Sequence, residues 1–332
     1  MAKKMEKVAV IGSNSFSGAH FVNHLLENTD YGVVGISRSS EYNPIFLPYK
    51  DKEENRFKFY KKDLNKDMDN LIDLFNKENV NKVVNFAAQG MVGESWNNPV
   101  HWYRTNVLGV IDLVERLKEK PNFQKYVQIS TPEIYGSCED INEKTPHNPS
   151  TPYANSKATA DIHIKLINKQ FDFPANFVRS TNVYGPCQQL FRIIPRTIIY
   201  NKLGRKIQLH NEGKSIKSYI HINDVCEGIF RIMETKDSGE VYHLSPRSGC
   251  SIRDIVQKIC NKTGKNFNEV TENIGERVGQ DKVYIIDSSK ARKKLEWKPI
   301  IDLDRGLEQC VEWVNKNWEV VKTLPLKYIH QE

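Results

Sequence analysis

Tyr153 and Lys157 are the two residues of this chain whose types and spacing most directly suggest chemistry. Residues four apart on a helix lie on the same face, so a lysine ammonium can come close to a tyrosine phenol. A nearby positive charge lowers the tyrosine pKa, which would make Tyr153 a base near neutral pH. The pair therefore predicts proton abstraction from an alcohol during hydride transfer, a prediction that needs supporting context because such spacings also arise by chance.

A glycine-containing turn near the start of the chain supplies that context. The apolar run Val8–Ile11 predicts a short strand, residues 12–18 a turn, and residues 19–28 an amphipathic helix. Backbone N–H groups of such a turn, together with the N-terminus of the following helix, can bind a pyrophosphate. We expect four residues of the turn to contact a dinucleotide: Gly12, Ser15, Phe16 and Gly18, with Ser15 where a third glycine is usual.

The end of the second predicted strand indicates which dinucleotide is bound. An acidic residue there would bond the ribose 2′-hydroxyl of NAD, whereas an arginine suits the 2′-phosphate of NADP. The chain has Ser37, Arg38 and Ser39, so NADP is favoured and NAD remains possible. A solvent-facing arginine is the other interpretation. Asp63 and Leu64, after the third strand, are candidates for contact with the adenine.

Strands and helices alternate along the first half of the chain, which predicts a parallel sheet covered on both faces. We expect an α/β fold: a Rossmann-type doubly wound parallel sheet with a smaller C-terminal α/β substrate-binding lobe, and an active site between them. The predicted domains are residues 1–186 and 187–332, with some later segments returning to the first domain. The expected strands include 32–36, 57–60, 82–86, 126–129 and 175–178, and the expected helices 71–79, 100–119, one from Tyr153, 190–202, 223–235, 251–263 and 304–317.

Composition limits the classes of function. The 332 residues are 39% hydrophobic and 27% charged, and the net charge of +7 comes from lysines spread along the chain, so we predict no nucleic-acid partner. No stretch approaches the ~20 apolar residues of a membrane span, and no signal-peptide core is visible, so a cytoplasmic protein is expected. The six cysteines form no C-x-x-C pair, and His101, His210 and His221 lack metal-ligand spacing, so no metal is predicted.

Several further motifs resemble the extended short-chain dehydrogenase/reductase family, the nucleotide-sugar epimerases and dehydratases. With the glycine turn they span nearly the whole chain: residues 85–88 (NFAA), 105–109 (TNVLG), 130–136 (STPEIYG), 153–157 (YANSK), 179–186 (RSTNVYGP), 217–224 (KSYIHIND) and 276–281 (ERVGQD). The resemblance implies that Ala87 and Ala88, with Tyr153 and Lys157, also contact the cofactor. It further implies a homodimer that pairs through helices near 100–118 and 153–169.

The segment after the fifth strand separates the activities within this family, and here it reads Thr131, Pro132, Glu133. The glutamate resembles that of NDP-hexose 4,6-dehydratases, which make 4-keto-6-deoxy nucleotide sugars. The resemblance implies that Tyr153 takes the 4-hydroxyl proton as hydride leaves carbon 4, that Glu133 removes the carbon 5 proton, and that water departs before hydride returns to carbon 6. Proline cannot donate a proton, so we expect Glu133 to act as both base and acid while Thr131 polarises the ketone.

The resemblance also implies contacts to a nucleotide-diphosphate sugar. Asn182, Lys217 and Arg277 match positions that bond the diphosphate, and Arg192 is a further cation that could reach it. Lysine at 217 keeps the charge but loses the bidentate geometry of the usual arginine. A 4-epimerase or decarboxylase of the same family remains an alternative. So does a non-catalytic nucleotide-sugar sensor, because a fold alone does not determine a function.

Overall fold

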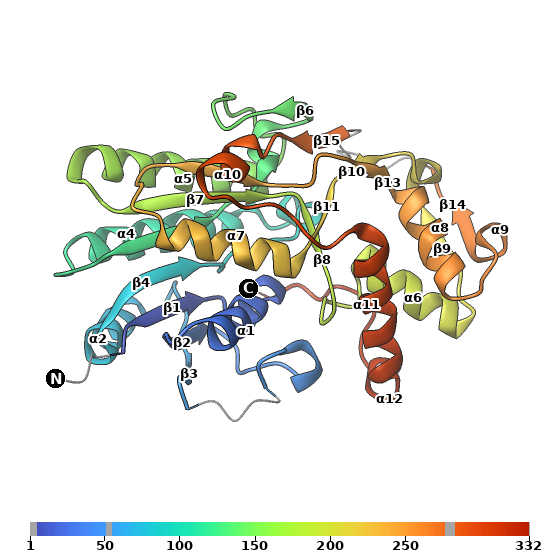
Figure 1. The fold of residues 1–332 in the computed structure, drawn as a ribbon, viewed down its shortest axis with the longest axis horizontal. Helices are drawn as coiled ribbons and strands as arrows, with labels where there is room; N and C mark the ends of the chain where they lie inside the picture. The colour runs from blue at the N-terminus through green and yellow to red at the C-terminus, as the bar shows by residue number, and fades with distance from the viewer. Residues whose placement is uncertain (1–4, 51–54, 276–282, 332) are drawn as a thin grey trace.

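Seven parallel strands form one sheet at the centre of the protein (Figure 1). The computed structural model describes residues 5–50, 55–275 and 283–331. The strand order is β12-β7-β5-β4-β1-β2-β3, so the direction of winding reverses between β1 and β4, the place where open α/β sheets bind ligands. The strands are β1 (Lys7–Ile11), β2 (Gly32–Ser37), β3 (Phe57–Lys61), β4 (Val80–Asn85), β5 (Lys125–Ile129), β7 (Ala175–Ser180) and β12 (Val241–Leu244).

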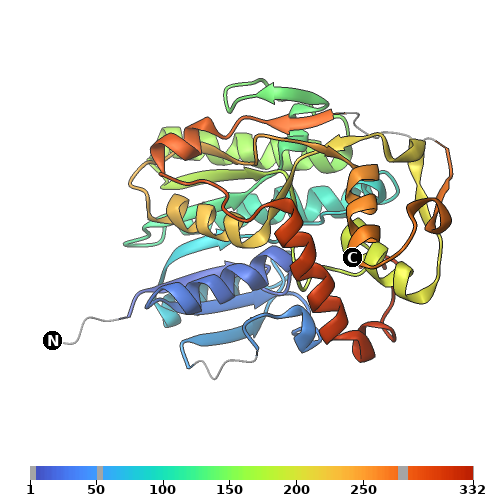
Figure 2. The same ribbon diagram turned by 45° about the vertical axis from the view of Figure 1, so that its right-hand side comes forward.

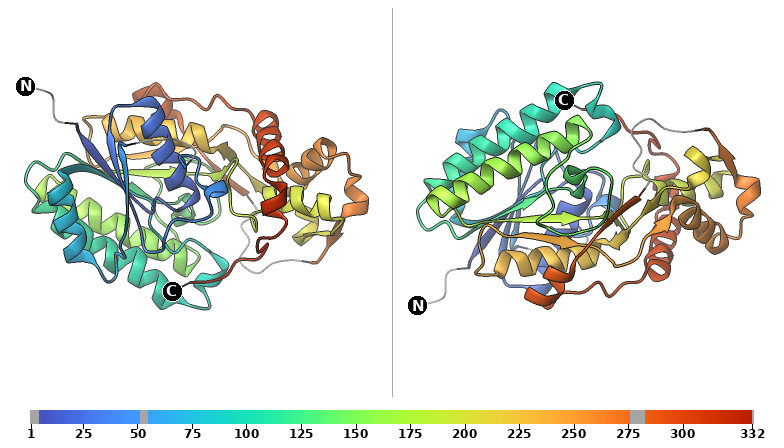
Figure 3. Two further views of the ribbon diagram at one scale, coloured as in Figure 1. Left: turned by 90° about the horizontal axis from the view of Figure 1, so that it is seen from below. Right: turned by 90° about the horizontal axis from the view of Figure 1, so that it is seen from above.

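Helices cover both faces of this sheet, as the view from below shows (Figure 3, left). One apolar core lies between the sheet and three helices: α2 (Met68–Glu78), α4 (Gly109–Lys118) and α5 (Pro152–Phe171). A second core lies on the opposite face, under α1 (Phe16–Asn28), α7 (Ile222–Glu234) and α10 (Ser289–Lys294). A strand buried on both faces must be apolar throughout, which is why Val8–Ile11 forms a continuous apolar run.

The helix expected over residues 100–119 is interrupted in the middle. It consists of α3 (Pro99–Tyr103), a π-helical turn η3 (Arg104–Leu108) and α4, which follow one another without a loop. Four short 3₁₀ turns also occur in the described chain: η1 (Pro44–Phe46), η2 (Gly93–Ser95), η4 (Pro132–Tyr135) and η5 (His210–Gly213). The π-turn was not foreseen, because the apolar spacing of the sequence does not distinguish a π-turn from one turn of α-helix.

A smaller lobe lies beside the sheet and contains most of the later elements (Figure 2). Its main helices share a third apolar core: α6 (Ile193–Leu203), α8 (Ile252–Lys262) and α11 (Leu303–Lys316). The lobe also contains two short helices, α9 (Phe267–Val270) and α12 (Trp318–Val321). The remaining short strands are β6 (Cys138–Ile141), β8 (Asn182–Tyr184), β9 (Ile207–Leu209), β10 (Ile216–Lys217), β11 (Tyr219–His221), β13 (Cys250–Ser251), β14 (Thr271–Asn273) and β15 (Val283–Ile286).

The predicted fold class and the order of the main elements are confirmed. β12 pairs in parallel with β7 although it lies far beyond residue 186, so one strand of the second predicted domain belongs to the central sheet. The helices on either side of β12 in sequence, α7 and α10, also pack on that sheet. The boundary at residue 186 itself stays a prediction.

Candidate active site

The turn between β1 and α1 requires glycine at both predicted positions. Gly12 has a φ of +82°, and a Cβ there would lie 2.8 Å from the backbone nitrogen of Ala87 at the end of β4. A Cβ on Gly18 would lie 2.2 Å from the carbonyl oxygen of Gly12. Ser15 is the N-cap of α1, where its hydroxyl accepts a hydrogen bond from the Gly18 N–H at 3.1 Å, and Phe16 begins the helix. This tight approach of backbone to a helix N-terminus fits the pyrophosphate of a dinucleotide.

Asn14 ties this turn to the end of β2, a role that the sequence did not reveal. Its N–H donates to the Ser37 hydroxyl at 3.0 Å, and its side-chain amide donates to the Ser39 and Ser40 carbonyls at 3.2 and 2.8 Å. Asparagine inside the Gly12–Gly18 turn was the available signal. The contacts hold the Gly12–Gly18 turn and the segment after β2 at a constant separation.

The other predicted cofactor residues lie near this turn but differ in exposure. Arg38 donates to the carbonyl oxygen of Gln331 at 3.0 Å. Asp63 accepts a 2.8 Å bond from the Asn65 N–H and so shapes its own turn, while Leu64 is buried in the apolar core. Ala87 donates its N–H to the Asn85 side chain at 3.0 Å, and Ala88 is exposed.

Thr131, Glu133 and Tyr153 meet where β5 ends and α5 begins. Thr131 caps the η4 turn by accepting the Glu133 N–H at 3.2 Å. Tyr153 lies in the first turn of α5, which Thr151 caps by accepting the Ala154 N–H at 3.1 Å. Burial and the negative charge of Glu133 raise the pKa of Tyr153, while its hydrogen bond with Thr131 opposes this shift. The predicted hydroxyl, carboxylate and phenol therefore come together in one place.

Lys157 is buried, and its interactions differ from those expected. Its ammonium donates to the Ile129 carbonyl at 2.8 Å, and burial lowers its pKa to about 8, while the charge of Asp161 opposes this shift. We expected Lys157 to lower the pKa of Tyr153, yet the Tyr153 pKa is raised in this structure, because burial and the Glu133 carboxylate outweigh the favourable interactions.

A buried polar network behind Thr131 was not foreseen. The Ser130 hydroxyl donates to Asp161 at 2.6 Å, and Arg179 forms an ion pair with the same carboxylate oxygen at 2.8 Å. Arg179 also donates to the Tyr135 hydroxyl, which pairs with His243 at 2.8 Å. Asp161 and Arg179 are both 0% exposed. Their signals in the sequence were a carboxylate one turn after Lys157 and an arginine in a strand expected at the centre of the sheet.

The predicted substrate residues come from three separate segments. Asn182, in β8, donates its side-chain amide to the Ser218 carbonyl at 3.1 Å, which places it beside Lys217 at the end of β10. Arg192 is exposed at the N-cap of α6, and its charge interacts with those of Glu133 and Tyr153. Arg277 lies outside the described residues.

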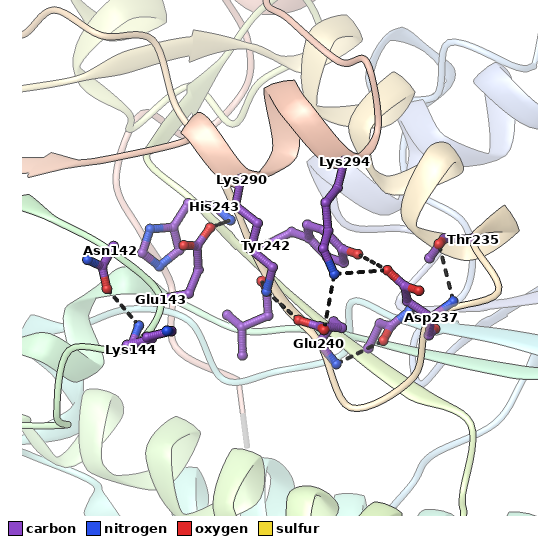
Figure 4. Close-up of polar contacts among 12 residues, drawn as sticks. Asn142, Glu143, Lys144, Thr235, Asp237, Glu240, Tyr242, His243, Lys290 and Lys294 are labelled. Carbon is purple, nitrogen blue, oxygen red and sulfur yellow. Dashed lines mark hydrogen bonds and ion pairs between the residues drawn. The ribbon is translucent and has the colours of Figure 1, made fainter.

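Two hollows of about 440 Å³ lie elsewhere on the molecule. The first is lined by His20, Pro186, His221 and residues of α11. The second lies beside α10 and is lined by several charged residues (Figure 4). There Glu240 forms ion pairs with Lys290 and Lys294, so the local charges largely neutralise one another and fasten α10 to the edge of β12. Neither hollow contains Tyr153 or Glu133 in its lining.

Comparison with known proteins assigns the family. A family model described as GDP-mannose 4,6 dehydratase matches residues 10–310. The chain belongs to this dehydratase family. The resemblance to the extended short-chain dehydrogenases/reductases that the motifs indicated is therefore confirmed.

Individual proteins are similar to this chain over most of its length. The low-salt glycan biosynthesis protein Agl12 of Haloferax volcanii is 30% identical over 92% of this chain and 97% of its own. The trifunctional UDP-glucose 4,6-dehydratase/epimerase/reductase RHM2 of Arabidopsis thaliana is 26% identical over 95% of this chain, which spans only 48% of that longer protein. The dTDP-glucose 4,6-dehydratase of Bacillus anthracis, solved in complex with NAD, has a TM-score of 0.87 and 28% identity, covering 97% of this chain and 100% of that one.

The described residues contain neither a metal-binding cluster nor a membrane-spanning helix. These residues contain no group of three or more His, Cys, Asp or Glu side chains arranged to hold a metal ion. Within the same ranges, the helices are too short or too polar to cross a bilayer.

Proposed function

We propose that this protein is an NDP-hexose 4,6-dehydratase that keeps a tightly bound nicotinamide dinucleotide. The observation that carries the proposal is the placement of Glu133 beside Tyr153, with Thr131 hydrogen-bonded to the phenol. A 4-epimerase needs the tyrosine but has no use for a carboxylate beside it. The family match over residues 10–310 supports the same reading.

Each catalytic side chain has a distinct task in this proposal. The dinucleotide, when bound, accepts hydride from carbon 4 of the sugar and returns it to carbon 6. Tyr153 accepts the proton of the 4-hydroxyl, and Thr131 donates a hydrogen bond to the oxygen at carbon 4. Glu133 removes the proton from carbon 5 and then donates it to the departing 6-hydroxyl, because Pro132 has no proton to give. Carbon 5 takes a new proton from solvent once carbon 6 has received the hydride, and Tyr153 releases its proton to solvent.

The sugar diphosphate is assigned to cations and an amide at the edge of the smaller lobe. Asn182 and Lys217 lie beside one another there, and the positive charge of Arg192 interacts with the carboxylate of Glu133. Arg277 is proposed as a fourth contact from its motif alone. Positive charges and amide donors at this place suit a pyrophosphate and disfavour an uncharged sugar.

The cofactor that we propose is NAD. Arg38 was the reason to favour NADP, but it donates to the Gln331 carbonyl, so part of its hydrogen-bonding capacity is already used within the protein. The glycine turn accommodates the pyrophosphate that both dinucleotides share. The Bacillus anthracis relative was solved with NAD, which supports this choice.

A homodimer and a cytoplasmic location also belong to the proposal. Large apolar side chains are exposed on α3, η3 and α5, the elements expected to pair: Val100, Leu108, Ile162 and Leu166. Ile162 and Leu166 lie four residues apart and so form one apolar strip on α5. A second copy of the chain would cover such a strip.

Mass spectrometry of reactions in deuterated water with the dTDP, UDP, CDP and GDP forms of nucleotide sugars, hexoses and hexuronic acids alike, tests the proposed activity. We expect one of these substrates to give a product lighter by one water, with a solvent deuteron at carbon 5. An unchanged mass with inverted carbon 4 would identify a 4-epimerase, loss of carbon dioxide a decarboxylase, and no reaction a nucleotide-sugar sensor. Any of these three results would overturn the dehydratase assignment.

A further inference from the structure

One extended segment connects the two ends of the candidate site. This 325–331 segment follows α12 and runs back across the molecule toward α3 (Figure 3, left). Its residues alternate: Leu326, Tyr328 and His330 are half-buried, whereas Ile329 is 66% exposed. A period of two is that of an extended chain lying with one side against a surface. The segment therefore rests on the protein through every second side chain.

Aromatic contacts anchor the inward side chains. The ring of His330 stacks on those of His101 and Trp102, each with a centroid separation of 5.3 Å, and shares a 3.0 Å hydrogen bond with His101. The Tyr328 ring meets Phe191 edge-on at 5.4 Å. The Tyr328 hydroxyl also lies 3.3 Å from His330. These rings join the smaller lobe to α3 of the sheet domain.

Beyond these rings, the segment presents a backbone carbonyl to the cofactor site. The Gln331 oxygen accepts hydrogen bonds from Arg38 and from Gln89, both at 3.0 Å. Arg38 follows β2 and Gln89 follows β4, the two strands on either side of β1 and its glycine turn. In dinucleotide-binding sheets the residues after the second strand read the 2′ position of the adenosine ribose. The Gln331 carbonyl is therefore held beside the group that reads this position.

The same segment also approaches the catalytic residues. Burial raises the pKa of Tyr328, while the positive charges of Arg38 and Arg192 act to lower it. Arg192 interacts in turn with the charges of Tyr153 and Glu133. The segment thus extends from the residue that reads the ribose to the edge of the catalytic cluster.

We propose that the 325–331 segment forms the outer wall of the dinucleotide site and that the Gln331 carbonyl selects NAD over NADP. The inference rests on the proposed use of a nicotinamide dinucleotide. The Gln331 carbonyl oxygen already accepts hydrogen bonds from Arg38 and Gln89, which use its two lone pairs, so it acts on the 2′ position by holding Arg38 and by repelling the acceptor oxygens of a 2′-phosphate. The carbonyl also engages Arg38, the side chain that a 2′-phosphate would require.

A matched set of variants tests this selection. The double variant Tyr328→Ala/His330→Ala removes the inward anchors, and Ile329→Ala, which changes an outward residue of the same segment, is the control. Calorimetry on protein freed of nucleotide measures the affinities for NAD and NADP. We expect the double variant to bind NADP about tenfold more tightly, because Arg38 is released to bond a 2′-phosphate, with a smaller change for NAD. An unchanged ratio of the two affinities would overturn the proposal.

A second measurement uses the unaltered protein. Lys327 is exposed in the segment and offers trypsin a site of cleavage. We expect NAD to slow cleavage there more than NADP does at equal occupancy, and equal protection by the two dinucleotides would count against the proposal. Neither experiment needs a sugar substrate. A protein that binds NAD in this way but dehydrates no nucleotide sugar would refute the proposed activity and leave this inference intact.

Discussion

Burial and a neighbouring carboxylate favour the protonated form of Tyr153. Burial and the Glu133 carboxylate raise its pKa, and Lys157, which was expected to lower it, donates to a backbone carbonyl. A phenol in this setting must lose its own proton before it can act as a base, and a positive charge brought near it favours that ionised form. The oxidised nicotinamide ring carries such a charge. We infer that cofactor binding and the basicity of Tyr153 are coupled.

Glu133→Gln should separate the two halves of the reaction. Glutamine keeps the size of the side chain but cannot take the carbon 5 proton, so we expect dehydration to slow by about a hundredfold to ten-thousandfold. Oxidation at carbon 4 needs only Tyr153, so reduced nicotinamide should accumulate and be visible by its absorbance. The control is Glu139→Gln, an exposed carboxylate in β6. Full turnover by Glu133→Gln would remove this residue from the mechanism.

The buried Lys157 should make stability depend on pH in a defined direction. Its pKa is lowered from 10.5 to about 8, so between these values the unfolded chain binds more protons than the folded one, and folding becomes more favourable as pH rises. Such a shift is worth roughly 3 kcal/mol. Urea unfolding of the wild type and Lys157→Met should show the wild type disadvantaged near pH 7. The difference between the two proteins should shrink toward about pH 10; a difference independent of pH would contradict the assignment.

At the scale of elements, the catalytic geometry depends on how α5 is joined to β5 and β7. Tyr153, Lys157 and Asp161 follow one another at single-turn intervals along α5. Asp161 bonds to Ser130 just after β5 and to Arg179 in β7. One buried carboxylate therefore connects the helix that carries the base to two neighbouring strands. The helix cannot shift along the sheet without breaking this pair.

Arg179→Met should destabilise the fold strongly, because it leaves the buried Asp161 carboxylate unpaired. Removing one partner of such a pair costs about 3–5 kcal/mol, and the unfolding free energy from urea titration measures it. The double variant Asp161→Asn/Arg179→Met should recover part of the loss, since the unpaired Asp161 charge is then removed as well. Arg305→Met, which breaks an exposed ion pair with Glu308, is the matched control and should have little effect. Equal losses in both single variants would show that burial of the pair is unimportant.

At the scale of the whole molecule, a strip of exposed apolar residues remains on the outside of α5. Its members Ile162 and Leu166 are 50% and 59% exposed. The neighbouring η3 turn adds Leu108. Because α5 also carries Tyr153 and Lys157, pairing of two copies through this strip would place the catalytic helix at the interface.

Ile162→Glu/Leu166→Glu should convert the proposed dimer into monomers, because two carboxylates would be buried at the centre of the interface. Analytical ultracentrifugation measures the result. Ile300→Glu, at an apolar residue that is 77% exposed elsewhere on the surface, is the control and should leave the dimer intact. A wild type that sediments as a monomer at all concentrations would contradict the expectation outright.

Much of the fold could be predicted from the sequence because local patterns determine it. The apolar run of β1, the glycine turn and the 3.6-residue spacing in α4 specify their elements from neighbouring residues alone. The meeting of Thr131, Glu133 and Tyr153 could also be anticipated, since their motifs resemble those of a known family. The π-turn between α3 and α4 could not, because a single wider turn shifts the apolar pattern by about one residue, too little to distinguish it from an ordinary α-helix.

The sequence by itself determined the order of the elements and the positions of the candidate residues along them. It predicted a doubly wound sheet, a glycine turn suited to phosphate and a tyrosine on a helix. Only the tertiary structure decided the environment of each group. It raised the pKa of Tyr153, turned Lys157 to a backbone carbonyl and brought Gln331 to Arg38, 293 residues away in the chain. The physical reason is that burial and electrostatic interaction depend on distances through space, which a linear pattern does not contain.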